Sequence, residues 1–129
     1  MKTQIEISEN DQVFKYCRLY TGPDGESHFQ DVEIQLSQSE GIGVRSETIA
    51  ASGFFFRVAG GKSNPNRQNA LRRQFVVLIE GTFEVMVAKN TKRRFKTGDI
   101  LLAEDVTGRG HITTSVDNKP WKAVFIPLD

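Results

Sequence analysis

The chain contains 129 residues, of which 38% are hydrophobic and 26% are charged, and its formal net charge is +1. This composition predicts one globular domain over residues 1–129 and argues against a disordered or membrane-spanning chain. Because Cys17 is the single cysteine, no intrachain disulfide can form. The N-terminal residues lack the apolar run of a secretion signal, so we expect a cytoplasmic protein with no membrane partner.

Acidic and basic side chains are unevenly distributed along the chain. Residues 1–56 carry nine acidic and four basic side chains, whereas residues 57–129 carry seven acidic and thirteen basic ones. This asymmetry is typical of a polyanion partner, or of two halves of one structure that attract each other. The densest basic run, residues 89–96, falls where a hairpin is expected to turn, which is typical of a solvated strand edge. The sequence therefore favours the second interpretation and no nucleic-acid partner.

Short apolar segments separated by turn residues predict strands along the whole chain. The predicted strands cover residues 32–37, 54–58, 74–81, 82–88, 99–103, 111–116 and 121–128, with turns at 80–81, 89–90 and 117–118. No segment has a convincing helical period, so crossover helices are not expected and the sheets should be antiparallel. This many short strands in one domain predict an all-β sandwich or barrel.

Two parts of the chain carry a family resemblance. The strand QFVVLIEG (74–81), followed by TFEV, the run RRFKTGDILLAED (93–105) and TGRGH (107–111), resembles the two-motif core of a cupin. Residues 18–34 and 101–113 are similar to one subgroup of small single-domain bacterial cupins. The resemblance implies a double-stranded β-helix, the RmlC-like jelly-roll barrel, formed by a single cupin domain over residues 1–129.

The resemblance also gives expected positions for metal ligands. In metal-binding cupins the first motif has two histidines, then a glutamate, then a closing glycine. Gly81 matches the glycine, and the spacing puts Gln74 at the glutamate position. The histidine positions fall on residues 68 and 70, or on 67 and 69, and none of these is a histidine. The second motif retains its histidine as His111.

These departures predict a degenerate metal site, because amide oxygens are weak substitutes for imidazole and carboxylate ligands. We therefore expect no cofactor. If a divalent zinc, iron, manganese or nickel ion binds, the candidate ligands are His111, Gln74, Glu104 and His28. The alternative for His28 is a histidine satisfied in a turn or at a subunit contact, since Phe29 breaks the strand alternation there.

Strand alternation puts Gln68, Arg72 and Gln74 on one side, which we expect to face the barrel interior. With His111 they predict a site for a small polar or anionic molecule, because amides, imidazole and a guanidinium fork converge there. The alternative is that Gln74 and His111 satisfy each other inside a filled barrel. Arg109 lies between two glycines in a loop near the mouth and is either an anion clamp or lid, or a solvated loop charge.

Two functions of different classes follow from these residues. The first is a binding module that holds a small polar or anionic molecule in the barrel. The second is an enzyme of the cupin type, such as a dioxygenase or isomerase, in which His111 holds a metal with unconventional ligands or acts as a general base. The missing pair of histidines favours the first.

Apolar residues on both faces of several strands predict a homodimer. In FFFRV (54–58) we expect Phe54, Phe56 and Val58 to face inward and Phe55 to face outward. Residues 75–78 and 123–126 are likewise apolar on both faces, so one apolar face needs a cover that a single domain does not provide. Residues 1–20, which include the strand-like segment 12–20, are a possible strand-exchange or dimer-forming segment.

Overall fold

The structure is a computed structural model, and it describes residues 7–38, 41–60 and 66–128. The strands are β1 (Val13–Thr21), β2 (Ser27–Gln35), β3 (Ser37–Gln38), β4 (Val44–Arg45), β5 (Phe55–Ala59), β6 (Gln74–Glu80), β7 (Thr82–Met86), β8 (Lys92–Lys96), β9 (Ile100–Ala103), β10 (Ile112–Ser115) and β11 (Trp121–Pro127). Two short 3-10 turns, η1 (Glu9–Gln12) and η2 (Ala88–Asn90), complete the fold. None of the described residues forms an α-helix, so the expected all-β class is confirmed.

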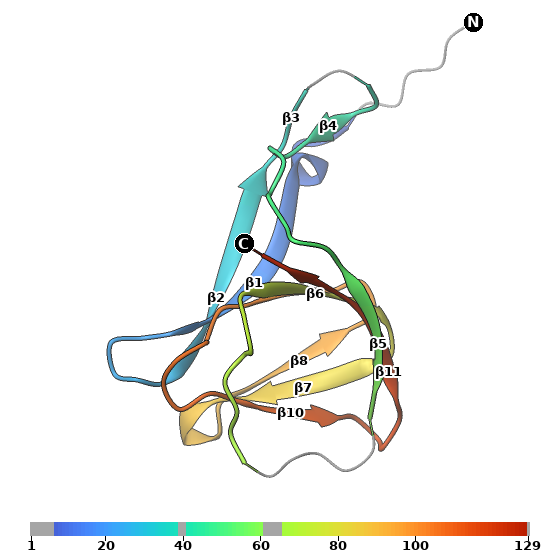
Figure 1. The fold of residues 1–129 in the computed structure, drawn as a ribbon. Helices are drawn as coiled ribbons and strands as arrows, with labels where there is room; N and C mark the ends of the chain where they lie inside the picture. Colours follow the sequence, from blue (N-terminus) through green and yellow to red (C-terminus); the bar gives the residue numbers. More distant parts are fainter. Residues whose placement is uncertain (1–6, 39–40, 61–65, 129) are drawn as a thin grey trace, which may run out of the picture.

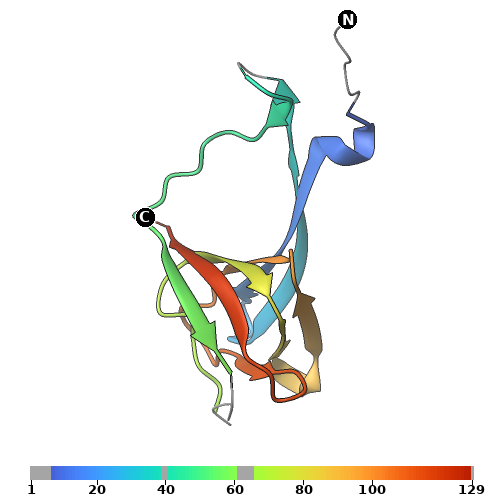
Figure 2. The ribbon, with the colours of Figure 1, turned by 90° about the vertical axis from the view of Figure 1, so that its right-hand side faces the viewer.

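The strands form a sandwich of two unequal sheets. The larger sheet has the order β2-β1-β9-β6-β11-β5, and the smaller has the order β10-β7-β8. The outer halves of β1 and β2 extend beyond the sandwich and carry the small β3–β4 pair at their far end (Figures 1 and 2). The space between the two sheets is therefore enclosed mainly by the strands from β5 onward and by the inner halves of β1 and β2.

The predicted turns fall where the chain needs a left-handed backbone. Gly81, between β6 and β7, has a φ of 94°, which glycine adopts without a steric penalty. Lys89 and Asn90 both have a φ of 57°, and Asp117 and Asn118 have values of 55° and 54°. Two successive left-handed residues give the tight turns that match the twist of hairpin strands. These three predicted turns are confirmed.

The expectation of wholly antiparallel sheets is wrong at one pair of strands. β1 and β9 run parallel, with Cys17 opposite Leu101 and Leu19 opposite Ala103. The chain segment between these strands forms most of the other strands of the sandwich, so a long return path joins β1 to β9 without a helix. The parallel pair lets β1 lie between β2 and β9 in the larger sheet.

The hydrophobic core fills the space between the two sheets. Its buried members are Cys17, Leu19, Val76, Leu78, Phe83, Val85, Val87, Phe95, Leu101, Trp121, Ala123 and Phe125. They alternate along each strand with residues on the outer face, as expected for the two-residue period of a β-strand. On β6 this alternation directs Val76 and Leu78 inward, and Gln74 shares their side.

The predicted orientation of residues 54–58 is wrong. Phe56 is 78% exposed and Val58 is 66% exposed, whereas Phe55 stacks on Phe125 with 5.2 Å between the ring centroids. The pairing of β5 with β11 explains this reversal, because Phe55 lies opposite the inward residue Phe125, and opposite residues in a pair of strands share a face. Arg57, two residues further on, therefore also faces inward.

Residues 12–20, the segment expected to join a partner's sheet, belong mostly to the larger sheet. β1 contains most of them and is hydrogen-bonded to β2 on one edge and to β9 on the other. The β2 edge is paired along the whole strand, but on the β9 edge only Cys17, Arg18 and Leu19 are paired, so strand exchange through the N-terminal part of β1 stays a prediction. Residues 1–6 of the expected dimer-forming segment lie outside the described residues. Within the part of the chain that the structure describes, no helix is long and apolar enough to cross a membrane.

Candidate functional site

The space between the sheets opens at one end into a cavity of about 1120 Å³. Its walls come from β5, β6, β9 and β11 of the larger sheet, from β7 and β10 of the smaller sheet, and from the segment 66–72 that precedes β6. The polar and charged residues that line it include Arg57, Gln68, Arg72, Gln74 and His111. Four of the five residues that the sequence assigned to a ligand site thus border one cavity.

Backbone pairing brings the two cupin-like motifs together at this cavity. The Gln68 amide donates to the carbonyl of His111 at 2.8 Å, and the His111 amide donates to the carbonyl of Gln68 at 3.0 Å. Such a reciprocal pair sets two side chains next to each other on the same face. Gln74, the first residue of β6, enters the cavity from the larger sheet.

Gly110 permits this close approach. Its φ is 77°, and a Cβ atom at this position would overlap the carbonyl group of Gln68. Gly108, with a φ of 81°, has a similar role, because a Cβ there would lie 2.5 Å from the carbonyl oxygen of Gly25. A side chain at either position would push the loop away from its neighbour. The two glycines of TGRGH therefore determine the backbone position from which the side chain of His111 extends.

A buried carboxylate holds the ring of His111. Asp105 Oδ2 lies 2.6 Å from His111 Nδ1 and accepts a hydrogen bond of 2.7 Å from the hydroxyl of Ser27. Asp105 is fully buried, and its Oδ1 lacks a hydrogen-bond partner among the described residues. Because Asp105 occupies Nδ1, the imidazole has Nε2 left for a ligand. The alternative in which Gln74 satisfies His111 is not the arrangement found.

Sequence reasoning missed Asp105 and Ser27. Asp105 ends the run LLAED, six positions before His111. This spacing between a carboxylate and a histidine was the available sign of their contact. Ser27 opens β2 and reaches Asp105 across 78 positions of the chain. Such a contact depends on the tertiary fold and has no local pattern that would predict it.

Arg109 does not line the cavity. Its guanidinium is 72% exposed and lies 2.6 Å from Glu26, which also pairs with Arg67 at 2.9 Å. Its backbone amide donates to the carbonyl of Gly25 at 2.9 Å. These contacts tie the loop to the β1–β2 turn, and Arg109 has a structural ion-pair partner in place of the free anion clamp that was one sequence interpretation.

Two of the four candidate metal ligands lie elsewhere. His28 Nε2 contacts Asp24 at 2.9 Å in the β1–β2 turn region, with both side chains largely exposed. Glu104 accepts hydrogen bonds of 2.6 Å from Arg18 and 2.6 Å from Arg73. Desolvation raises the pKa of Glu104, but the hydrogen bonds and charges of the two arginines outweigh it and leave that pKa below its ordinary value.

The cavity residues do not fit a resident transition-metal ion. His111 supplies one imidazole nitrogen, and the other cavity donors are amides and cationic guanidinium groups. Over the described residues, three His, Cys, Asp or Glu side chains do not converge anywhere in a metal-binding arrangement. Divalent ions of this class need several imidazole, thiolate or carboxylate ligands, whereas Arg57 and Arg72 repel cations.

The two arginines that line the larger cavity have no acidic partner among the described residues. The described residues that line it include Arg57 and Arg72 but neither aspartate nor glutamate. None of the ion pairs in the described part of the chain involves either arginine. Arg57 instead lies over the rings of Phe125 and Phe55, at 4.7 and 5.4 Å from their centroids. Sequence reasoning missed Arg57 because it gave β5 the opposite orientation.

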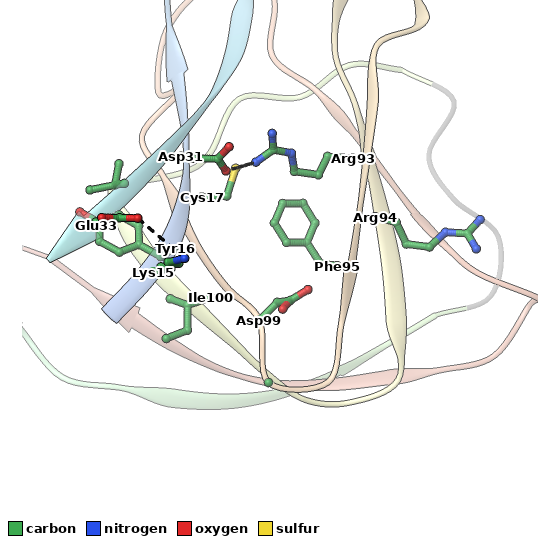
Figure 3. A pocket seen from close by; sticks show the side chains of 12 residues that line it. Lys15, Tyr16, Cys17, Asp31, Glu33, Arg93, Arg94, Phe95, Asp99 and Ile100 are labelled. Carbon is green, nitrogen blue, oxygen red and sulfur yellow. Dashed lines mark hydrogen bonds and ion pairs between the residues drawn. The ribbon is translucent and has the colours of Figure 1, made fainter. Parts of the chain in front are cut away.

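A second cavity of about 450 Å³ lies on the other side of the core, between β1, β2 and the β8–β9 region (Figure 3). Its charges largely pair with each other: Arg93 lies 2.6 Å from Asp31, and Lys15 lies 3.8 Å from Glu33. Cys17 is buried at its inner wall, and burial raises the pKa of the thiol although Arg93 opposes the effect. A thiol protonated at neutral pH is a poor nucleophile, so the larger cavity is the stronger candidate site.

Comparisons with known proteins show what the chain resembles in structure. No family model matches it, and no curated protein matches it. Among solved structures, it is similar to protein NMB1881 from Neisseria meningitidis, with 18% sequence identity and a TM-score of 0.46. The match covers 64% of this chain and 81% of the Neisseria chain. A likeness at this level does not assign a function.

Proposed function

We propose that this chain is a single-domain barrel of the cupin type, a double-stranded β-helix, that binds a small anionic molecule in its larger cavity. The observation that carries the proposal is the lining of this cavity: two guanidinium groups, four amides and one imidazole, with no acid among its described residues. The cupin assignment is supported by Gly81 at a hairpin turn and by Gln68, Gln74 and His111 at one cavity.

The chemistry of the lining favours an anion over a neutral or cationic ligand. Uncompensated guanidinium groups attract negative charge, and cavity walls of low dielectric strengthen that attraction. A guanidinium offers a planar fork of donors to a carboxylate or phosphate. Gln68 and Gln74 supply additional neutral donors and acceptors, and the apolar walls give the concave, mostly apolar shape of a small-molecule site.

A panel of small molecules tests the proposal. Thermal unfolding and isothermal titration calorimetry are measured with small organic and inorganic anions, with neutral polar molecules and with organic ammonium ions. We expect selective stabilisation by anions, and Arg72→Gln should weaken the binding about ten-fold, since a charge-assisted hydrogen bond contributes 1.5–3 kcal/mol. Arg94→Gln, which removes an exposed arginine paired with Glu84, is the matched control. Equal binding of ammonium ions and anions would refute the proposal.

A second candidate function is proton-transfer catalysis by His111. The contact of Nδ1 with buried Asp105 orients the ring, while Nε2 is left for a ligand. The test incubates the protein with each bound acid in D₂O and follows deuterium incorporation by mass spectrometry. Deuterium incorporation that His111→Gln abolishes would support an enzyme. An unchanged isotope pattern would refute catalysis by His111 for these acids, and the proposed function would then be binding without catalysis.

We also propose that two copies pair through the outer face of the larger sheet. The strand register aligns Ile100, Val77, Val124 and Phe56 in one apolar row across β9, β6, β11 and β5. Apolar side chains of this face with large exposed fractions are Phe54 at 65%, Phe56 at 78%, Val58 at 66% and Ile79 at 54%. A patch of this kind is uncommon on a monomer, and pairing would bury about 1,500 Å² or more in total.

Light scattering coupled to size-exclusion chromatography measures this pairing. We expect the mass of two chains at micromolar concentration and the mass of one chain for Phe56→Glu. Ile42→Glu is the matched control, since Ile42 is even more exposed to solvent than Phe56 but lies beside the distant β3–β4 pair. A monomeric unaltered protein, or a dimer that Phe56→Glu leaves intact, would contradict pairing through this face.

A further inference from the structure

An aromatic wall, made of rings from both sheets, lines part of the larger cavity. Phe55, Phe83, Trp121 and Phe125 all line it. Phe55 stacks on Phe125 at 5.2 Å, Phe125 on Trp121 at 6.4 Å, and Trp121 lies 4.8 Å from Phe83. The four rings come from β5, β7 and β11 and form a continuous surface. Such a surface favours a ligand with a flat, apolar body, because aromatic pairs gain from offset-stacked and edge-to-face contacts beyond the area they bury.

Arg57 links this wall to the positive charge of the cavity. Its guanidinium carbon lies over the rings of Phe125 and Phe55. A guanidinium that lies over an aromatic ring keeps its N–H donors directed along its own plane, where a carboxylate can accept two of them. A carboxylate attached to an aromatic ring is coplanar with that ring in its relaxed form. Pairing with Arg57 would therefore extend the ligand's ring along the same wall.

The apolar surface and the charge together discriminate among anions. Inorganic phosphate and acetate would satisfy the arginines but leave the rings of the wall without a partner. A neutral aromatic molecule would contact the wall but leave Arg57 and Arg72 without a counter-charge. Only a ligand with both parts uses both features, since hydrogen bonds between charged groups are the stronger ones and apolar contact adds to them.

We infer that the ligand of the larger cavity is a small aromatic carboxylate, with its carboxylate at Arg57 and Arg72 and its ring against Phe55 and Phe125. This inference rests on the proposed anion-binding function and narrows it to one chemical class. Arg57 and the aromatic rings thereby gain a role in specificity that the sequence motifs alone did not give them.

Calorimetry with a matched set of probes tests the inference. The probes are benzoate, phenylacetate, benzamide, acetate and inorganic phosphate, and the fluorescence of Trp121, the single tryptophan, provides a second readout at the site. We expect at least one aromatic acid to bind about ten-fold or more tightly than benzamide, acetate and phosphate. Arg57→Gln should weaken that binding about ten-fold, Arg57→Lys should weaken it less, and Arg94→Gln should leave it unchanged.

The outcomes separate this inference from the proposed function. If acetate or phosphate binds as tightly as the aromatic acids and depends on Arg57, the anion site stands and the aromatic class is wrong. If benzamide binds as tightly as benzoate, the arginines do not select the charge and the inference is wrong. If no anion binds to protein whose circular dichroism and cooperative unfolding show it to be folded, both are refuted. Variants that unfold at a lower temperature are compared with the unaltered protein below both transitions.

Discussion

The chain has two histidines, and each contacts an aspartate, yet the two pairs lie in opposite environments. His28 and Asp24 form an exposed pair at the β1–β2 turn, with 42% and 54% of their side chains accessible. His111 and Asp105 form an inner pair at the cavity, with 15% and 0% accessible. The distances differ little, at 2.9 and 2.6 Å. Burial, more than distance, determines how much each pair contributes to the stability of the fold.

Water can replace the contact between His28 and Asp24 with little loss of folding free energy, because both side chains are accessible to solvent. Water cannot do so at the inner pair, since a buried polar group that loses its partner retains the cost of its desolvation. The inner pair also belongs to a chain of contacts from Ser27 through Asp105 to the cavity. We therefore expect changes at the inner pair to affect both stability and the site, and changes at the exposed pair to affect neither strongly.

The largest difference is expected on removal of each aspartate. Asp105→Ala leaves Ser27 and His111 without their shared acceptor inside the protein, and should lower the free energy of unfolding by about 3 kcal/mol. Asp24→Ala removes an exposed carboxylate and the turn hydrogen bond that it accepts from the Glu26 amide, and should lower the free energy of unfolding by about 1 kcal/mol or less. Urea unfolding followed by circular dichroism measures both. Equal midpoints for Asp105→Ala and the unaltered protein would mean that the inner pair contributes no more than the exposed one.

The glycines beside the two pairs provide a second comparison. Gly110 and Gly25 have similar φ values, 77° and 79°, but a Cβ at 110 would overlap Gln68, whereas a Cβ at 25 would meet nothing within 4 Å. Gly25→Ala should therefore cost about 1 kcal/mol for backbone strain alone. Gly110→Ala should cost about 2–3 kcal/mol in the same unfolding measurement, because the loop must also move. A smaller cost at 110 than at 25 would contradict the close approach.

The sequence predicted most strands and the three turns, because alternation and residues such as Asn90 and Asn118 act locally, but it missed β8, which lies in the basic run expected to turn. It also predicted that Gln68, Gln74 and His111 border one cavity, since strand parity and a family pattern set their side. Sequence-based prediction failed where tertiary contacts determine the orientation or the partner of a side chain. The segment FFFRV has apolar residues at both parities, so its pattern did not define the inward face and Arg57 was missed. Asp105 was missed because its partners come together only in the folded chain.

A third prediction converts the inner histidine into a metal ligand. Gln68→His with Gln74→Glu adds an imidazole and a carboxylate beside His111, which together make a three-ligand set. We expect the affinity for Zn²⁺ or Ni²⁺ to rise about 100-fold or more, while the unaltered protein should carry well under one equivalent of metal. Titration with a competing chelator and elemental analysis measure these quantities.

The control for this design is the same double variant with His111→Ala. It should lose most of the gained affinity, since two ligands hold a transition metal poorly. No gain in the double variant would contradict the register that aligns Gln74 and Gln68 with the family's ligand positions, or the position of His111 beside them.

The smallest effect is expected from the titration of the exposed pair. The hydrogen bond from His28 is the main cause that lowers the pKa of Asp24 below its ordinary value. A carboxylate with a lowered folded pKa stabilises the fold above its unfolded pKa, and the contribution is lost as the pH falls through the folded pKa. His28→Ala should therefore raise the pKa of Asp24, and any stability difference from the unaltered protein should vanish in acid. NMR titration of the Asp24 carboxyl carbon measures the shift.

The control for this titration is His111→Ala. It should leave the pKa of Asp24 unchanged, because the two pairs have no residue in common. A shift of that pKa in His111→Ala would show that the exposed and inner pairs are coupled through the β1–β2 turn.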